Sequence, residues 1–226
     1  MPLTIAIDGP VGAGKSTISD AVAKRLGILH LDTGAMYRAV GLCALESGVD
    51  PRDEESVCRL CEEGRAQVDV AYENGAQRTL LHGRDVSTAI RTQEAGKAAS
   101  AVSRYLTVRR MLVQRQQEIA RSQSMLLDGR DIGTVVLPDA TVKIYLTASP
   151  EARATRRMLQ LREKGDETPF EDILAEVNAR DYQDMHREID PLRQAEDAIL
   201  VDSSDLSFDE TVDAILKLAK KAEAKA

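Results

Sequence analysis

The chain has 226 residues, of which 43% are hydrophobic and 30% are charged, a composition that excludes fibrous and disordered proteins. No apolar run approaches the roughly 18 residues that a membrane span requires. The 30 Lys and Arg residues against 37 Asp and Glu leave a net charge of −7, which disfavours a surface that attracts nucleic acid or anionic lipid as a whole. We therefore expect neither a nucleic-acid nor a membrane partner, and any anionic ligand must be bound by a local cluster of cations.

The cysteines and the N-terminal residues favour a cytoplasmic location. Cys43, Cys58 and Cys61 are too few, and odd in number, for a disulfide framework. The N-terminus enters a strand-like run at once, without the basic stretch and apolar segment of a signal peptide.

Five short apolar runs alternate with helical patterns, which predicts an α/β fold with a central five-stranded parallel sheet between layers of helices. The predicted strands are Leu3 to Ile7, Ile28 to Leu31, Met125 to Leu127, Val142 to Leu146 and Ile199 to Val201. Between them, Val68 to Tyr72, an Asn74-Gly75 turn and Thr79 to Leu81 predict an antiparallel hairpin. We expect a single domain with a core of residues 1–32 and 124–226 and an insertion at about 33–123 that carries a small antiparallel sheet.

A complete G-x-x-x-x-G-K-[S/T] motif directly follows the first strand and precedes a helical pattern, which is the context that a phosphate-binding P-loop requires. Backbone N–H groups of such a loop point at phosphate oxygens, and the helix that follows adds its positive dipole end. Lys15 is expected to reach the β- and γ-phosphates and Ser16 to hold Mg²⁺. The motif and the next residue are Gly9, Pro10, Val11, Gly12, Ala13, Gly14, Lys15, Ser16 and Thr17.

Polar clusters follow three of the predicted strands, where open α/β sheets bind their ligands. They begin at Asp32, Asp128 and Asp202. Asp128 ends an apolar strand and is a candidate to hold Mg²⁺ through water. A strand-ending Asp that caps the next turn is the equally supported alternative.

A helical pattern from Phe170 to Arg187 has an inner face that is apolar at first and charged at its end. Ile173 and Val177 are followed on that face by Arg180, Asp184 and Arg187. Either this end lines a polar cleft or the three charges form an exposed ladder within the helix. Thr168-Pro169-Phe170-Glu171 predicts a capping box with proline at the first helical position.

The preceding helical segment, which starts at Pro150, carries four cations largely on one side. These are Arg153, Arg156, Arg157 and Lys164. A solvated face is one interpretation. Beside a P-loop, we favour a mobile lid at about 150–168 that closes over a triphosphate.

The chain resembles the bacterial cytidylate kinases, a family of small P-loop nucleoside monophosphate kinases. Seven segments carry the resemblance in the family's order: IDGPVGAGKST, LDTGAMYRA, IRTQEAGKAAS, LLDGRDIGTVV, RRMLQLREKG, ARDYQDMHRE and LVDSS. The inserted hairpin region also resembles the enlarged monophosphate-binding insertion of this family. The resemblance implies transfer of the γ-phosphoryl group of Mg·ATP to CMP and dCMP by a monomer.

The resemblance also implies roles for individual residues. Thr33 and Arg38 are expected near the acceptor phosphate, and Ser100, Arg109 and Asp131 at the cytosine edge. Arg180 and Asp184 are expected at the sugar, whereas Arg130 and Arg187 would clamp phosphates. The expected catalytic set consists of Arg130 and Arg187 together with Lys15, Arg153 and Arg157.

Two alternatives remain open at the level of the sequence. One is a P-loop kinase for another small acceptor, such as UMP, AMP or shikimate. The other is a non-catalytic nucleotide-binding regulator or an ATPase switch with a partner protein. The concentration of arginines favours two phosphorylated ligands, and therefore a transferase.

Overall fold

A computed structural model describes residues 2–121, 123–163 and 165–223 of the chain. They form two compact units, one of Leu3–Ile28 with Met125–Ala226 and the other of Leu29–Ser124. The predicted insertion at about 33–123 falls inside the second unit, which begins four residues before it. Within the described ranges, no helix is both long and apolar enough to cross a membrane.

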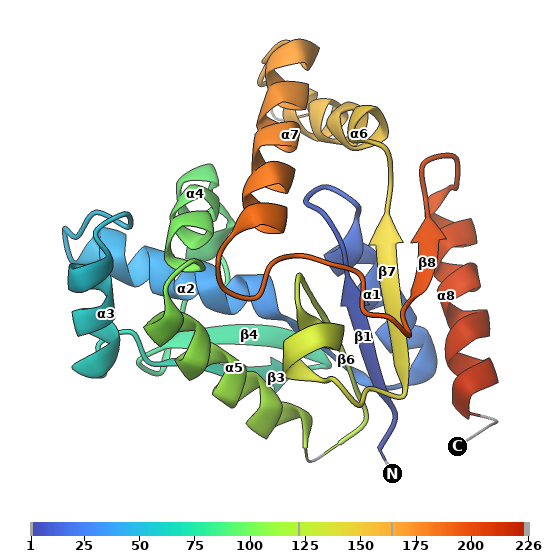
Figure 1. Ribbon diagram of the computed structural model, residues 1–226, viewed down its shortest axis with the longest axis horizontal. Helices are drawn as coiled ribbons and strands as arrows, with labels where there is room; N and C mark the ends of the chain where they lie inside the picture. Colours follow the sequence, from blue (N-terminus) through green and yellow to red (C-terminus); the bar gives the residue numbers. More distant parts are fainter. Residues whose placement is uncertain (1, 122, 164, 224–226) are drawn as a thin grey trace. The chain divides into compact units, whose positions relative to one another are not determined.

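The predicted five-stranded parallel sheet is confirmed, in the order β2-β6-β1-β7-β8 (Figure 1). Its strands are β1 (Thr4–Asp8), β2 (Leu29–Asp32), β6 (Met125–Gly129), β7 (Val142–Thr147) and β8 (Ile199–Asp202). Each lies within two residues of the predicted run. β1 is the central strand, with β6 and β7 as its neighbours.

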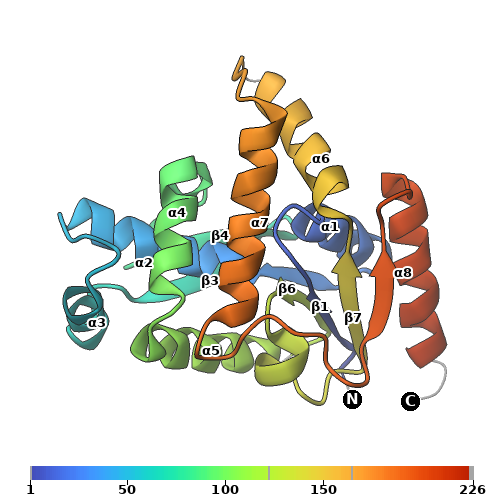
Figure 2. The same ribbon diagram turned by 45° about the horizontal axis from the view of Figure 1, so that its top comes forward.

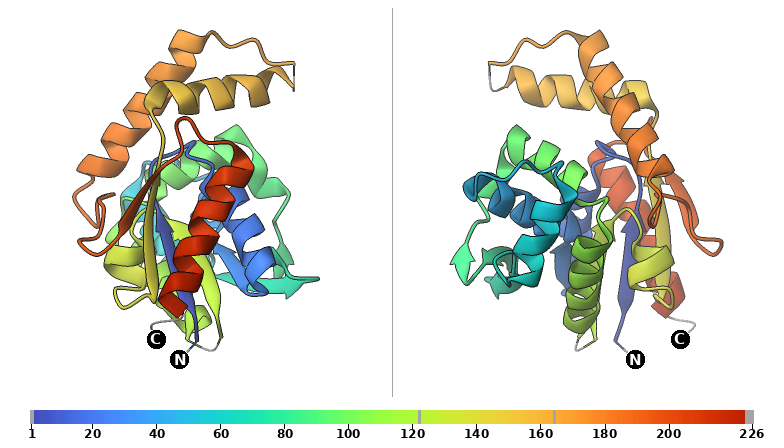
Figure 3. Two further views of the ribbon diagram at one scale, coloured as in Figure 1. Left: turned by 90° about the vertical axis from the view of Figure 1, so that its right-hand side faces the viewer. Right: turned by 60° about the vertical axis from the view of Figure 1, so that its left-hand side comes forward.

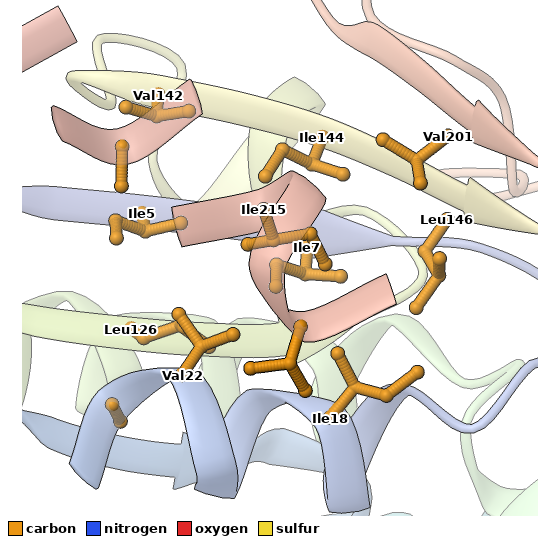
Figure 4. Packing of buried hydrophobic residues seen from close by; sticks show 13 residues of the cluster. Ile5, Ile7, Ile18, Val22, Leu126, Val142, Ile144, Leu146, Val201 and Ile215 are labelled. Atoms are coloured by element: carbon orange, nitrogen blue, oxygen red, sulfur yellow. The ribbon is translucent and has the colours of Figure 1, made fainter. Parts of the chain in front are cut away.

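The apolar core of the first unit explains why β1 reads as an unbroken hydrophobic run. Ile5, Ala6 and Ile7 are completely buried because both faces of a parallel strand are covered. Helices α1 (Lys15–Leu26) and α8 (Phe208–Glu223) contribute Val22 and Ile215 to this cluster. Figure 4 shows these side chains close to β1 and its neighbouring strands.

Strand register determines which residues meet at the carboxyl end of the sheet. Asp8 is opposite Gly129 of β6 on one side and Tyr145 of β7 on the other. The residues that follow β1 and β6 therefore leave the sheet at the same level, whereas β7 continues to Thr147 beside β8. A short π-helix, Ile132–Val136, follows β6.

Helices α6 (Pro150–Arg162) and α7 (Phe170–His186) pack against each other through Ala154, Ile173 and Val177 (Figures 2 and 3). The predicted capping box is wrong. Pro169 is the N-cap of α7, and no side chain within the described ranges caps this N-terminus. Thr168 precedes the N-cap by one residue, and its hydroxyl donates to Asp166 Oδ1 at 2.6 Å instead of to the backbone of the helix. The helix also ends one residue before Arg187, whose backbone is extended.

The second unit contains the predicted hairpin, which is confirmed. Asn74 and Gly75 both have positive φ, as a tight two-residue hairpin turn requires. The strands of its antiparallel sheet are β3 (Val68–Glu73), β4 (Ala76–Leu81) and β5 (Arg84–Asp85). The helices are α2 (Thr33–Glu46), α3 (Glu54–Glu62), α4 (Gln93–Val102) and α5 (Leu106–Ala120), with a 3₁₀ turn at Ala89–Arg91.

Candidate active site

The P-loop connects the central strand to the N-terminus of α1, as predicted. Gly9 has φ +153°, and a Cβ atom there would lie 1.9 Å from the carbonyl oxygen of Leu146. Gly14 is the N-cap of α1 in a left-handed conformation. Both positions require glycine, so the motif encodes the shape of the loop as well as its chemistry.

Lys15 is folded back onto the loop that precedes it. Its Nζ atom donates hydrogen bonds of 2.7 Å to the carbonyl oxygens of Gly9 and Pro10. Burial lowers the pKa of Lys15 to about 7, and the nearby charge of Arg130 acts in the same direction. The ammonium group therefore sits where a polyanion would compensate its desolvation.

Ser16 and Asp128, the two residues that the sequence predicts to hold Mg²⁺, lie next to each other. The Ser16 hydroxyl donates to Asp128 Oδ1 at 3.3 Å, and Asp128 is buried near the end of β6. No group of three or more potential metal ligands of the His, Cys, Asp or Glu types occurs among the described residues. One or two protein oxygens suit Mg²⁺, which commonly takes its other ligands from phosphates and water.

Asp8 joins the end of β1 to the segment that follows β6. Its carboxylate oxygens accept hydrogen bonds of 2.7 Å from the N–H groups of Ile132 and Gly133. Burial raises the pKa of Asp8 to about 6 despite these bonds, and the charge of Asp131 adds to the rise. Asp8 thus anchors the backbone immediately after Arg130 and Asp131.

The charged end of α7 faces the end of β6, which distinguishes between the two interpretations of the helical pattern. Arg130 Nε lies 2.8 Å from Asp184 Oδ2. Arg187 lies 3.5 Å from Asp131, and its Nε atom donates to the carbonyl oxygen of Asp190 at 2.7 Å. These pairs join α7 and the residue that follows it to the segment after β6, so the charged stripe is not an exposed ladder within one helix.

The Arg130–Asp184 pair alters the titration of its carboxyl group. Burial is the largest single influence and would raise the pKa of Asp184, but the charge and hydrogen bond of Arg130, together with the charge of Arg187, outweigh it and hold that pKa below its usual value. Arg180, which is half-buried on the same helix, adds to this effect.

The cations of the predicted lid have different environments. Arg153 is only 3% exposed and is bonded to the P-loop and to Asp181. Arg156 bonds to Ser203, after β8. Arg157 is half-buried on α6, and Lys164 lies outside the described residues. α6 therefore does not present one uniform solvated face.

In the second unit, Asp32 organises the start of α2. Its Oδ1 atom caps the helix at the N–H of Ala35, and its Oδ2 atom lies 2.7 Å from Arg38 Nη2. Burial opposes ionisation of Asp32, but Arg38 and then Arg91 hold its pKa below the usual value. Thr33 is buried as the first residue of α2. Arg38 Nε is buried and has no hydrogen-bond partner among the residues that the structure describes.

Arg109 and Ser100 also belong to the second unit, on α5 and α4. Arg109 is 1% exposed; it donates to the carbonyl oxygen of Ser103 at 3.3 Å, and its guanidinium carbon lies 5.8 Å from the centre of the Tyr37 ring. Ser100 is half-buried. A buried guanidinium on an aromatic face is a rigid, directional donor.

Sequence reasoning missed the anchoring acids Asp8 and Asp181, and it placed Asp32 only at the start of a polar cluster, without a role of its own. Asp8 and Asp32 end strands that the sequence did predict, so their positions were a usable signal. Asp181 lies off the predicted stripe of α7, and only the packing of α6 against α7 places it at Arg153.

The chain is similar to known proteins over nearly its whole length. The model of the cytidylate kinase family matches residues 5–221. A cytidylate kinase from Thermosipho melanesiensis is 49% identical over 98% of both chains. One from Caldicellulosiruptor saccharolyticus is 48% identical over 97% of this chain and 96% of its own. The crystal structure of an uncharacterized protein from Eubacterium ventriosum is similar in fold, with a TM-score of 0.54, 10% identity and coverage of 96% of this chain and 98% of its own.

Proposed function

Because the chain belongs to the cytidylate kinase family, we propose that it transfers the γ-phosphoryl group of Mg·ATP to CMP and to dCMP. The products are ADP and either CDP or dCDP. The observation that carries this proposal is the P-loop at the end of β1, where Lys15 and the Ser16–Asp128 pair lie within electrostatic reach of Arg130.

The P-loop, Gly9 to Thr17, binds the triphosphate of the donor in this proposal. Lys15 exchanges its bonds to Gly9 and Pro10 for bonds to the β- and γ-phosphates. Ser16 and Asp128, the latter through water, would hold Mg²⁺, which would supply positive charge to neutralise the phosphates. The P-loop, the helix N-terminus and the two oxygen ligands support this assignment.

The acceptor residues are assigned by resemblance. Thr33 and Arg38 bind the phosphate of CMP, and Ser100, Arg109 and Asp131 read the cytosine. Arg180 and Asp184 bind the sugar side, and Arg130 and Arg187 clamp phosphates. A carboxylate such as that of Asp131 suits the exocyclic amine of cytosine, which is a hydrogen-bond donor.

The chemistry needs no protein base. The second pKa of a phosphate monoester is near 6, so most CMP is already dianionic at pH 7. A phosphate oxygen of CMP attacks the γ-phosphorus, the bond from that phosphorus to the β–γ bridging oxygen breaks, and ADP leaves with the electron pair. Lys15, Arg130, Arg187, Arg153 and Arg157 align the phosphates and offset charge on the transferring group.

The remaining expectations concern water, location and assembly. We infer that the lid at about 150–168 closes over bound nucleotide and excludes water, which would otherwise compete as the acceptor. The protein is expected to act as a cytoplasmic monomer, without nucleic-acid or membrane partners. The family resemblance supports the monomer, and the net charge of −7 supports the absence of polyanionic partners.

A panel of acceptors tests the proposed function. ADP production from Mg·ATP is followed in a coupled assay with CMP, dCMP, UMP, AMP, shikimate or no acceptor. We expect strong turnover with CMP and dCMP only. Lys15→Ala is the control for a contaminating kinase and should lose the activity, because the variant lacks the cation of the phosphate cradle.

Other outcomes identify other functions. Strong turnover with a different acceptor would keep the P-loop kinase and refute the cytosine assignment. ADP production without any acceptor, or tight ATP binding without turnover, would instead favour a nucleotide-dependent switch or regulator.

A further inference from the structure

Arg153 links three segments of the first unit. Its Nε atom donates to the carbonyl oxygen of Ala148, which precedes α6, at 2.8 Å. Its Nη1 atom donates to the carbonyl oxygen of Val11 in the P-loop at 2.9 Å. Asp181 on α7 accepts from Nη1 at 3.0 Å and from Nη2 at 2.5 Å. One buried guanidinium therefore ties the P-loop to both α6 and α7.

The bond to Val11 orients a peptide unit of the phosphate cradle. In a trans peptide the C=O group and the following N–H group point in opposite directions. With the oxygen of Val11 held by Arg153, the N–H of Gly12 points away from Arg153. The side chain of Arg153 also packs against the loop, because a Cβ atom on Gly12 would lie 3.3 Å from Arg153 Cβ.

Asp181 is the group that orients this guanidinium. A bidentate carboxylate fixes the plane of the fork as well as its charge. Both partners are buried, with side chains 3% and 13% exposed, so removing the carboxylate leaves an uncompensated cation in a desolvated position. Three residues further along α7, Asp184 accepts one hydrogen bond from Arg130, at 2.8 Å from its Nε atom. A single helix thus carries the acids that orient two site arginines.

We propose that Asp181 is a positioning residue for the donor nucleotide. It acts through Arg153 to hold the Val11–Gly12 peptide in the orientation that binds a triphosphate. The inference rests on the proposed function in one respect, namely that the P-loop binds Mg·ATP. It adds a residue that touches neither substrate and yet determines the affinity for one of them.

Calorimetric titration with Mg·ATP tests this inference without turnover. Asp181→Asn keeps the size of the side chain and removes its charge, and we expect the Kd for Mg·ATP to rise roughly tenfold, the effect of weakening one charge-assisted contact. Glu176→Gln is the matched control, because Glu176 is an exposed acid on the same helix. Its Kd should stay within about twofold of the wild type, as for a surface substitution.

The route through Arg153 is tested by a double-mutant cycle. Arg153→Ala should itself weaken Mg·ATP binding, and adding Asp181→Asn to it should change the Kd less than about twofold, because the two residues act as one unit. In steady-state kinetics, Asp181→Asn should raise the KM for ATP more than the KM for CMP. Hydrogen exchange of the peptide that contains residues 9–16 should become faster in the same variant.

The outcomes separate this inference from the proposed function. Failure of the wild type to bind Mg·ATP would refute the proposed function. Binding by the wild type with an unchanged Kd in Asp181→Asn, or additive effects in the cycle, would refute the role of Asp181 alone. If Asp181→Asn does not fold, Asp181→Glu displaces the carboxylate by one methylene group, and an unchanged Kd there would equally overturn the inference.

Discussion

At the scale of single residues, the recurring feature is an arginine oriented by a carboxylate. Arg130, Arg153 and Arg187 pair with Asp184, Asp181 and Asp131 in the first unit, and Arg38 pairs with Asp32 in the second. Held in this way, a guanidinium loses little further freedom when a phosphate arrives, since its side chain is already ordered. The sequence predicted these arginines but not which acid holds each of them.

The cytosine-reading role assigned to Asp131 can be tested by substrate choice. In Asp131→Ala, we expect the preference for CMP over UMP in kcat/KM to fall by about 10- to 100-fold, because the acceptor for the exocyclic amine is lost. Asp139→Ala, an exposed acid in the same segment, is the control. Relative kcat/KM values for CMP, UMP and AMP that match those of the wild type would place cytosine recognition elsewhere.

The raised pKa of Asp8 predicts an unusual dependence of stability on pH. The folded protein retains the proton to about pH 6, whereas the unfolded chain releases it near the ordinary pKa of 3.8. Between these values the folded state binds more protons, so the contribution of Asp8 to the free energy of unfolding falls as pH rises. The total loss is at most about 3 kcal/mol and is complete above pH 6.

Denaturant unfolding of the wild type and of Asp8→Asn at several pH values measures this effect. The asparagine does not titrate, so the stability of the wild type relative to the variant should decline from about pH 4 to pH 6 and then level off. A difference that is constant across this range would show that Asp8 ionises normally in the folded protein.

At the scale of elements, the local sequence pattern located helix α7 but did not determine its N-cap. Periodicity located α7 and predicted its change from an apolar to a charged face, and its buried residues Ile173 and Val177 agree with that pattern. The capping box failed because the chain places Pro169 at the N-cap. A motif of four residues specifies a possible cap, but the path of the incoming chain decides which residue occupies that position.

Packing of α2 against α4 gives a matched pair of glycine substitutions in the second unit. A Cβ atom on Gly41 would lie 2.8 Å from Ala98 Cβ and 2.9 Å from the Ala99 backbone nitrogen. We expect Gly41→Ala to destabilise the protein by about 1 to 3 kcal/mol through overpacking, despite the higher helix propensity of alanine. At Gly96, in α4, no described atom outside the helix's own backbone and the neighbouring residues lies within 4 Å of the added atom.

Gly96→Ala should therefore stabilise the protein by about 0.5 to 1 kcal/mol through helix propensity alone. Urea unfolding of both variants beside the wild type provides the comparison. Equal effects of the two substitutions would mean that close packing of α2 on α4 does not limit position 41.

At the scale of the whole molecule, a ligand that binds only the folded protein must stabilise it. Mg·ATP at about 100 times its Kd should add about 2.7 kcal/mol to the free energy of unfolding. Scanning calorimetry should show a rise of several degrees in Tm, and the rise should be lost in Lys15→Ala. A Tm of the wild type that does not respond to Mg·ATP would contradict ATP binding by the P-loop.

The sequence by itself determined the features that rest on consecutive residues. The P-loop, the five parallel strands and the Asn74-Gly75 hairpin are encoded locally, by glycines that permit particular backbone angles and by the spacing of apolar side chains. Only the tertiary structure decided the partners of the charged groups. Asp8 meets Ile132, 124 residues away, and Arg153 meets Val11, 142 residues away. Such pairs depend on which strand end and which helix face come together, and this is determined by burial of the apolar core rather than by any local pattern.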